Sequence, residues 1–169
     1  MLAWISDNYS STPADVQLVL WGQSIGAGVG CTAAAEYLHN AEHRHRPQIA
    51  GLILETPFVS IRDMLAALYP QRWLPYRYLW PFLRSHWNSE KALQSIASTE
   101  MGWRMKILLL AAAKDEVVPA TEAEKLHDVC LALSLDVIRH DVVGALHAEA
   151  SMKGKGPGTI ARFVVDTTT

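Results

Sequence analysis

The amino-acid sequence predicts an α/β protein, with a parallel β-sheet of about four strands flanked by helices. Short, uniformly apolar runs alternate with helical segments along the chain, which is typical of parallel strands joined by right-handed crossovers. The chain has 169 residues, of which 50% are hydrophobic. This length and composition predict a single domain over residues 1–169 with a buried core.

The predicted elements follow one another in a regular order. Residues 2–9 are expected to end a helix before a turn. Four apolar runs are then expected to be strands, at residues 16–21, 49–55, 106–112 and 135–142. Three segments are expected to be helices, at about residues 25–39, 121–133 and 159–165. The unbroken apolar character of the first run favours a central strand that is covered on both faces.

The first strand runs directly into a G-x-S-x-G motif at residues 22–26. A strand, this motif and a helix of small residues form the sequence pattern of a nucleophile elbow, whose serine hydroxyl is lifted clear of the sheet. We expect positions 22 and 26 to require glycine, because a side chain at Gly22 or Gly26 would collide with a neighbouring strand or block the strained serine backbone. An isolated motif of this kind can equally be an ordinary glycine-rich strand-to-helix junction. Here the apolar strand before the motif and the helix of small residues after it both fit a nucleophile elbow. Ser24 is therefore the predicted nucleophile.

A serine nucleophile needs a base that accepts its proton and an acid that orients the base. In proteins with this elbow, the acid and then the histidine follow the serine along the chain. Asp115 and His147 fit this order, and each follows a predicted strand at the edge where α/β sheets place ligand sites. Other assignments stay open at this point. Asp115 could cap the next helix, Asp136 or Asp141 could orient the base, and His140 is a second histidine, although it lies within a strand pattern.

Two other kinds of site are disfavoured by spacing. His39 and His43 could share one helix face, but apart from Glu42 no acidic residue or cysteine stands at ligand spacing, so we expect no metal site. The glycines of residues 26–30 do not follow the G-x-G-x-x-G spacing of dinucleotide-binding proteins. No cofactor is therefore expected.

Charge, cysteines and hydropathy narrow the choice of partner and compartment. The net charge of −2, a pI near 6.4 and scattered basic residues disfavour nucleic acid as a partner. Cys31 and Cys130 lie far apart in apolar helical stretches and are expected to be buried free thiols. No apolar run is long enough to span a membrane, and the first residues do not form a signal peptide. As given, the chain is expected to be soluble, with its compartment unknown.

The elbow, the acid and the histidine together resemble the α/β-hydrolase superfamily, and more closely the membrane-tethered serine hydrolases of the bud-emergence (Bem) type. The similarity covers most of the chain and is carried by four motifs, GQSIG at 22–26, ETPFVSI at 55–61, WNS at 87–89 and DEVVP at 115–119. The resemblance implies that Ser24 is the nucleophile, Asp115 the orienting acid and His147 the general base. It also implies that the backbone N–H of Ile25 is an oxyanion donor and that the substrate is a small or lipid-like acyl compound.

The sequence departs from this family at its N-terminal side. Relatives of this type carry an N-terminal anchor that holds them in endomembranes, several earlier strands, and a loop that supplies a second oxyanion N–H. We therefore expect the C-terminal part of an α/β-hydrolase domain, truncated at its N-terminus. Losing one oxyanion donor costs on the order of 3 kcal/mol of transition-state stabilisation. An exposed sheet edge at residues 16–21 would favour self-association.

An aromatic insert at residues 64–98 corresponds to the cap that covers the active site in this family. Its prolines break it into short helical pieces. The aromatic side chains either pack against the core or form an acyl-chain cleft or a membrane-facing lid, because apolar aromatic pockets suit lipid-like ligands. We expect Trp80, Trp87 and Phe58 to line the substrate cleft.

Two functions of different classes follow from these observations. The first is a serine hydrolase that cleaves an ester, thioester or amide through an acyl-enzyme. The alternative is a truncated or catalytically incompetent hydrolase-fold fragment that acts as an interaction module. The substrate is not determined by the sequence, because one fold hosts many functions.

Overall fold

The protein is described here from a computed structural model, which describes residues 16–40, 47–68 and 87–168. The helix predicted at residues 2–9 and most of the predicted cap, including Trp80, lie outside the described residues. Four strands form one sheet in the order β1-β2-β3-β4. They are β1 (Gln17–Gln23), β2 (Gln48–Glu55), β3 (Lys106–Ala112) and β4 (Asp136–Val142), and neighbouring strands pair in parallel. The predicted fold class is confirmed.

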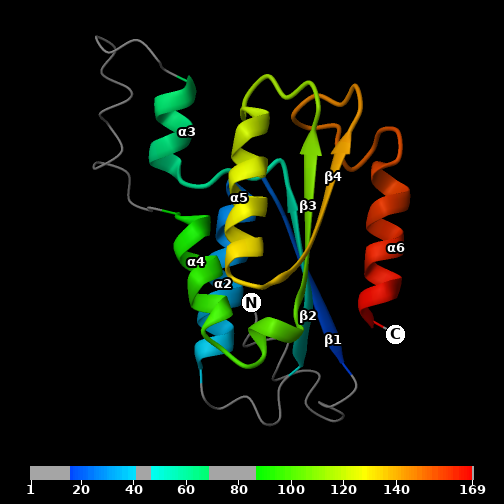
Figure 1. The fold of residues 1–169 in the computed structure, drawn as a ribbon. Coiled ribbons are helices and arrows are strands. Elements are labelled where there is room, and N and C mark those ends of the chain that lie inside the picture. The colour runs from blue at the N-terminus through cyan, green and yellow to red at the C-terminus, as the bar shows by residue number, and fades with distance from the viewer. Residues whose placement is uncertain (1–15, 41–46, 69–86, 169) are drawn as a thin grey trace.

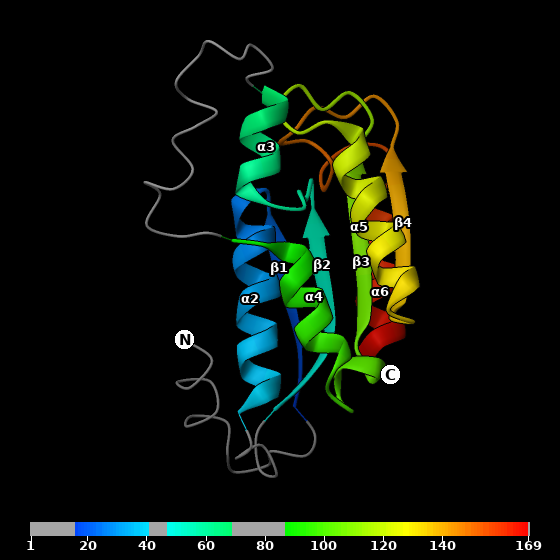
Figure 2. The same cartoon turned by 60° about the vertical axis from the view of Figure 1, so that its left-hand side comes forward.

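The helices lie on both faces of the sheet (Figures 1 and 2). On one face are α2 (Ile25–His39), α4 (Ser89–Ala97) and α5 (Ala120–Ala132), and on the other is α6 (Gly156–Thr168). Each strand lies beside the one that precedes it, so right-handed crossovers place all the connecting helices on the same face. Among the described helices, α6 follows the last strand and covers the opposite face.

The core has two parts because successive residues of a strand point to opposite faces of the sheet. Leu52, Leu54 and Leu109 face the three-helix side, where they join Cys31 and other buried helix residues. The intervening residues of β2 and β3 face α6, and they pack with Ile160 and Phe163. Burial on both faces explains why β2 and β3 are almost entirely apolar.

Strand β1 differs from the sequence-based prediction of a central strand. Within the described residues it lies at the edge of the sheet, Leu18 and Leu20 are half-buried, and Trp21 is 53% exposed. The apolar run indicated that both faces can be covered, but it could not indicate which segments cover them. The edge that the sequence led us to expect at residues 16–21 is thus unpaired among the described residues.

The segment between β2 and β3 contains helix α3 (Ile61–Leu68), then α4, and then the short 3₁₀ helix η4 (Gly102–Arg104). Helix α4 begins with a polar cap, since the Asn88 side chain accepts a 2.9 Å hydrogen bond from the Lys91 N–H. Leu93 and Ile96 on α4 are fully buried in the core beside α2. Residues 89–97 are therefore a helix that packs into the core, and the predicted extent of the cap stays a prediction.

Candidate active site

Ser24 occupies a sharp turn between β1 and α2. Its backbone has φ 53° and ψ −117°, which is a costly conformation for a residue with a Cβ. The Ser24 N–H donates a 2.9 Å hydrogen bond to the Glu55 carbonyl, so the turn is tied to the end of the neighbouring strand. This strained strand-to-helix turn is the geometry of a nucleophile elbow.

The two glycines of the motif are not equivalent. A Cβ on Gly22 would lie 2.1 Å from the Gly26 carbonyl oxygen, so only glycine fits there. The obstacle is the first turn of α2, whereas we expected the neighbouring strand. A Cβ on Gly26 would have no neighbour within 4 Å among the described residues. The expectation for Gly26 is therefore wrong, because its Cβ direction points into open space beside the helix.

Asp115 and His147 lie together at the carboxyl ends of β3 and β4. The His147 Nδ1 is 3.0 Å from Asp115 Oδ1 and 2.9 Å from Oδ2, and only 4% of the Asp115 side chain is exposed. Asp115 Oδ1 also accepts hydrogen bonds from the N–H groups of Val117, at 2.8 Å, and Val118, at 2.7 Å. An ionised carboxylate only accepts hydrogen bonds, so Nδ1 donates the proton and Nε2 keeps its lone pair. His147 is thus held in the tautomer that a general base requires.

The alternative residues are arranged differently. Asp141 on β4 is bound to Arg139, with the Arg139 Nε 3.1 Å from its carboxylate. Asp136 begins β4 and so lies at the opposite end of the sheet from Asp115. His140 lines a surface groove between β4 and α6. Among these candidates, the structure brings only Asp115 and His147 together.

The loop after β4 is hydrogen-bonded to the strand end that leads into the Ser24 turn. The His147 carbonyl accepts a 3.4 Å hydrogen bond from the side chain of Gln23, the residue before Ser24. The His147 N–H donates a 3.0 Å hydrogen bond to Glu116, which follows the acid. These contacts bring His147, the loop that carries Asp115 and the Ser24 turn to one edge of the sheet. Gln23 and Glu116 stand within the motifs named above, but nothing in the sequence indicated their contacts.

Glu55 is a second connection that sequence reasoning missed. It ends β2 and is 2% exposed. One of its carboxylate oxygens accepts a 3.1 Å hydrogen bond from the indole N–H of Trp21, and the other accepts a 2.8 Å bond from the Ser151 N–H. The carboxylate therefore joins β1 to the loop that carries His147. A charged residue directly after an apolar strand was the available signal, because buried carboxylates are rare without partners.

The predicted oxyanion and cleft residues have mixed outcomes. Ile25 is the first residue of α2, where the backbone N–H groups have no acceptor within the helix, which suits an oxyanion donor. Phe58 is fully buried in a cluster with Ile61 and Val118, and half-buried Trp87 packs against it. Phe58 therefore does not line a cleft in the described structure, because the turn after β2 directs it into the core.

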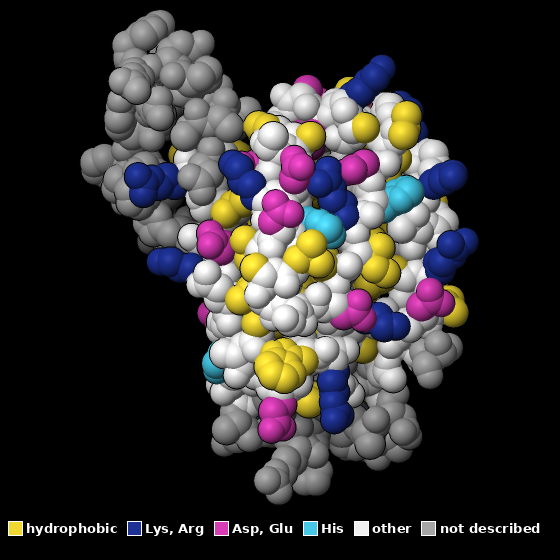
Figure 3. All heavy atoms as spheres, in the orientation of Figure 1, with side chains coloured by type: hydrophobic (Ala, Val, Ile, Leu, Met, Phe, Trp, Pro, Cys, Tyr) yellow, Lys and Arg dark blue, Asp and Glu magenta, His cyan; other side chains and the backbone are white. Residues whose placement is uncertain are grey.

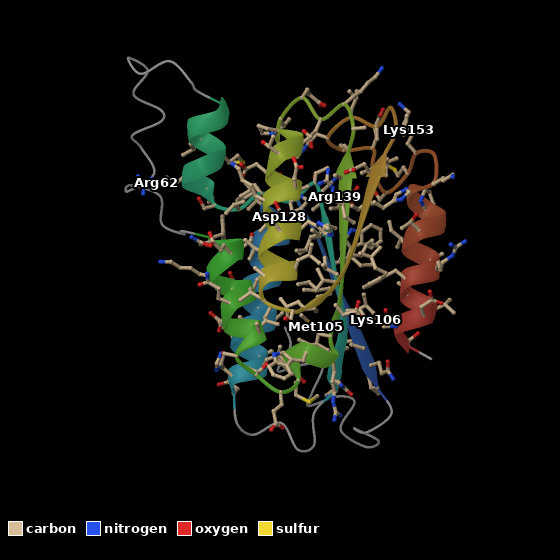
Figure 4. All side chains as sticks on the ribbon, viewed as in Figure 1. Arg62, Met105, Lys106, Asp128, Arg139 and Lys153 are labelled. Carbon is tan, nitrogen blue, oxygen red and sulfur yellow. The ribbon has the colours of Figure 1, made fainter. Side chains whose placement is uncertain are left out.

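The side-chain views show where charged residues lie relative to the two ends of the sheet (Figures 3 and 4). Lys153, labelled in Figure 4, lies on the loop after β4 at the same end as the arrowheads of the strands, and Met105 and Lys106 lie at the other end. Lys and Arg side chains are interspersed with Asp and Glu on the face seen in Figure 3. That mixture agrees with the scattered charges noted in the sequence.

Curated proteins with similar sequences come from bacteria and fungi. An uncharacterized protein of Mycobacterium tuberculosis is 32% identical over 123 residues, which is 73% of this chain and 35% of that protein. The protein bem46 of Schizosaccharomyces pombe is 28% identical over 114 residues, 68% of this chain and 32% of bem46. An uncharacterized membrane protein of Saccharomyces cerevisiae is 32% identical over 116 residues, 68% of this chain and 34% of that protein. No family model matches the chain.

Solved structures share the fold of this chain. An alpha-beta hydrolase of Vibrio vulnificus matches with a TM-score of 0.65 and 20% identity, over 90% of this chain and 49% of that one. Acyl-protein thioesterase 2 of Zea mays matches with a TM-score of 0.59 and 17% identity, over 99% of this chain and 63% of that one. The chain therefore has the fold of these proteins over nearly its whole length.

The chain aligns with about a third of the length of the curated relatives. An esterase of Pyrococcus furiosus also shares its fold, with a TM-score of 0.60 and 18% identity over 98% of this chain and 57% of the esterase. Within the described residues, no helix combines the length and apolar character that crossing a membrane requires.

Proposed function

We propose that this protein is a serine hydrolase of the α/β-hydrolase superfamily, which cleaves an ester, thioester or amide through an acyl-enzyme. The observation that carries the proposal is the contact between Asp115 and His147, together with the hydrogen bond from Gln23 that holds the His147 loop beside the strained Ser24 turn. A carboxylate, an oriented imidazole and an elbow serine are the parts that acyl transfer by a serine requires.

The proposed reaction has two halves. His147 Nε2 removes the proton of the Ser24 hydroxyl while the Ser24 oxygen attacks the carbonyl carbon, and the Ile25 N–H donates a hydrogen bond to the oxyanion that forms. The intermediate then expels the leaving group, which takes the proton from His147. A water molecule, deprotonated by the same imidazole, attacks the acyl-enzyme and releases the acid and free Ser24.

An acyl compound, small or lipid-like, is the proposed substrate. The esterase and the acyl-protein thioesterase that share the fold support an acyl group, although their identity to this chain is below 25%. The aromatic content of the predicted cap and the relative named as a membrane protein support a lipid-like acyl chain.

A second candidate is a hydrolase-fold module that binds a partner without catalysis. The observation that favours it is the edge of β1, which is unpaired among the described residues and carries Trp21 at 53% exposure. Unpaired strand edges pair readily with other strands.

A fluorophosphonate probe tests both candidates, because it reacts covalently with an activated serine. We expect the wild type to be labelled, Ser24→Ala to be unlabelled, and His147→Ala to be labelled at least 100-fold more slowly. Ser98→Ala is the control, since Ser98 is an exposed serine at the end of α4. Equal labelling of the wild type and Ser24→Ala contradicts the hydrolase. A cooperatively folded wild type that is not labelled supports the binding module instead.

A further inference from the structure

Thr56, the residue that follows β2, combines two unfavourable features. Its φ is +44°, a left-handed value that is a genuine outlier for a β-branched residue. It is also 2% exposed, and its hydroxyl has no hydrogen-bond partner among the described residues. Buried hydroxyls almost always have a partner, and glycine would meet the backbone requirement without strain. These two facts indicate that the hydroxyl itself has a role.

A small cavity lies between Thr56 and the proposed catalytic acid. Its volume is about 10 Å³, and Thr56, Asp115 and the apolar residues around them line it. A cavity needs about this volume to hold one water molecule, provided that polar groups face it. The Thr56 N–H is already bound to the Leu110 carbonyl at 2.8 Å, so the strained backbone is held in place while the side chain lies at the cavity.

Asp115 has room for one more donor. A carboxylate has about four acceptor positions. In the described structure, Oδ1 accepts from two backbone N–H groups and shares the His147 Nδ1, and Oδ2 is in contact with that Nδ1 alone. The side chain is 4% exposed, so bulk solvent has little access to the remaining position. A threonine hydroxyl and one water molecule can supply the missing bond.

We propose that Thr56 is a positioning residue for Asp115 and that it acts through one water molecule in this cavity. The Thr56 hydroxyl donates a hydrogen bond to the water oxygen, and the water donates to the Asp115 carboxylate. This bond adds a further constraint on the orientation of the carboxylate, and through it on the imidazole of His147. The kinetic part of this inference rests on the proposed serine hydrolase, whereas the water site itself does not.

Two substitutions separate the hydroxyl from the shape of the side chain. Thr56→Val keeps the branched shape and the same backbone strain but removes the hydroxyl, and Thr56→Ser keeps the hydroxyl. With p-nitrophenyl acetate as substrate, we expect Thr56→Val to lower kcat about tenfold with KM within twofold, the rate equivalent of a hydrogen bond to a charged group. Thr56→Ser is expected to retain most of the activity. If the hydroxyl had no partner, Thr56→Val would instead raise the Tm and leave kcat unchanged, which would overturn the proposal.

A second measurement does not depend on activity. High-resolution crystal structures of the wild type and Thr56→Val are expected to show a water within hydrogen-bonding distance of Thr56 Oγ1 and Asp115 in the first and none in the second. A dry cavity in the wild type overturns the proposal. If the water is present but neither Ser24 labelling nor hydrolysis is detected, the proposed function fails and the water site stands. If the wild type is active and Thr56→Val equals it, only the positioning role fails.

Discussion

Replacing Gly22 by alanine tests whether the elbow depends on close backbone contact. The added Cβ would lie 2.1 Å from the Gly26 carbonyl oxygen, 2.4 Å from its carbon and 2.7 Å from the Ala27 nitrogen. Contacts below 3.0 Å are essentially unknown for real Cβ atoms, and all three obstacles are backbone atoms that cannot rotate away. The first turn of α2 must therefore move by about 1 Å relative to β1, an estimate that follows from the 2.1 Å and 3.0 Å distances.

That displacement has two expected consequences. Overpacking of this kind lowers the free energy of unfolding by about 1–3 kcal/mol, which corresponds to a Tm lower by about 2–12 °C for a chain of this size. A shift of about 1 Å at the serine also slows labelling of Ser24 by about 100-fold, because acyl transfer depends on near-attack geometry. Both effects come from one methyl group.

Gly26→Ala is the matched control, because its Cβ meets no described atom within 4 Å. Alanine replaces glycine inside α2, so we expect unchanged or slightly higher stability, by up to about 1 kcal/mol. Thermal unfolding followed by circular dichroism measures the stability, and fluorophosphonate labelling measures the geometry of Ser24. Equal Tm values for Gly22→Ala and the wild type would refute the reasoning, as would a lower Tm for Gly26→Ala than for Gly22→Ala.

Two further predictions concern titratable groups. Burial raises the pKa of Cys31 and of Cys130 to about 12, so neither thiolate forms near pH 8. We expect Ellman's reagent to leave the native protein unmodified and to titrate two thiols in guanidinium chloride. Rapid reaction of the native protein would contradict this prediction. The Leu146 N–H and then Lys153 lower the pKa of Glu149 from 4.5. A carboxylate whose pKa is lowered by folding stabilises the fold at pH values above its unfolded-state pKa. This stabilisation is lost as the pH falls through the folded-state pKa. Glu149→Gln should therefore lower the Tm slightly at neutral pH and not in acid, and an equal decrease in both would exclude the ionised carboxylate as the cause.

Part of the candidate site follows from chain order and local pattern. The apolar runs predict β2 and β3 because a strand covered on both faces needs apolar side chains at every position. The carboxyl ends of parallel strands share one edge of the sheet, so Ser24, Asp115 and His147, each just after a predicted strand, were expected at that edge. The contact of Asp115 with His147 agrees with that expectation, and the roles of these residues stay proposals.

Other features depend on contacts between segments far apart in the chain, which local pattern does not encode. Glu55 joins Trp21 to Ser151, which stands 96 residues after Glu55, and Gln23 meets His147 across 124 residues. Phe58 shows the same limit, since an aromatic residue after a strand suits a cleft wall or a core equally well.

The amino-acid sequence by itself determined the parallel α/β class, the strand-to-helix turn at Ser24 and the order of the acid and the histidine. Only the tertiary structure decided which carboxylate faces His147, which of the two motif glycines is indispensable, and that Thr56 is strained and buried beside Asp115. The physical reason is that periodicity and turn chemistry act over a few neighbouring residues. Pair selection, steric obstruction and hydrogen-bond satisfaction are settled only when distant segments meet in the folded chain.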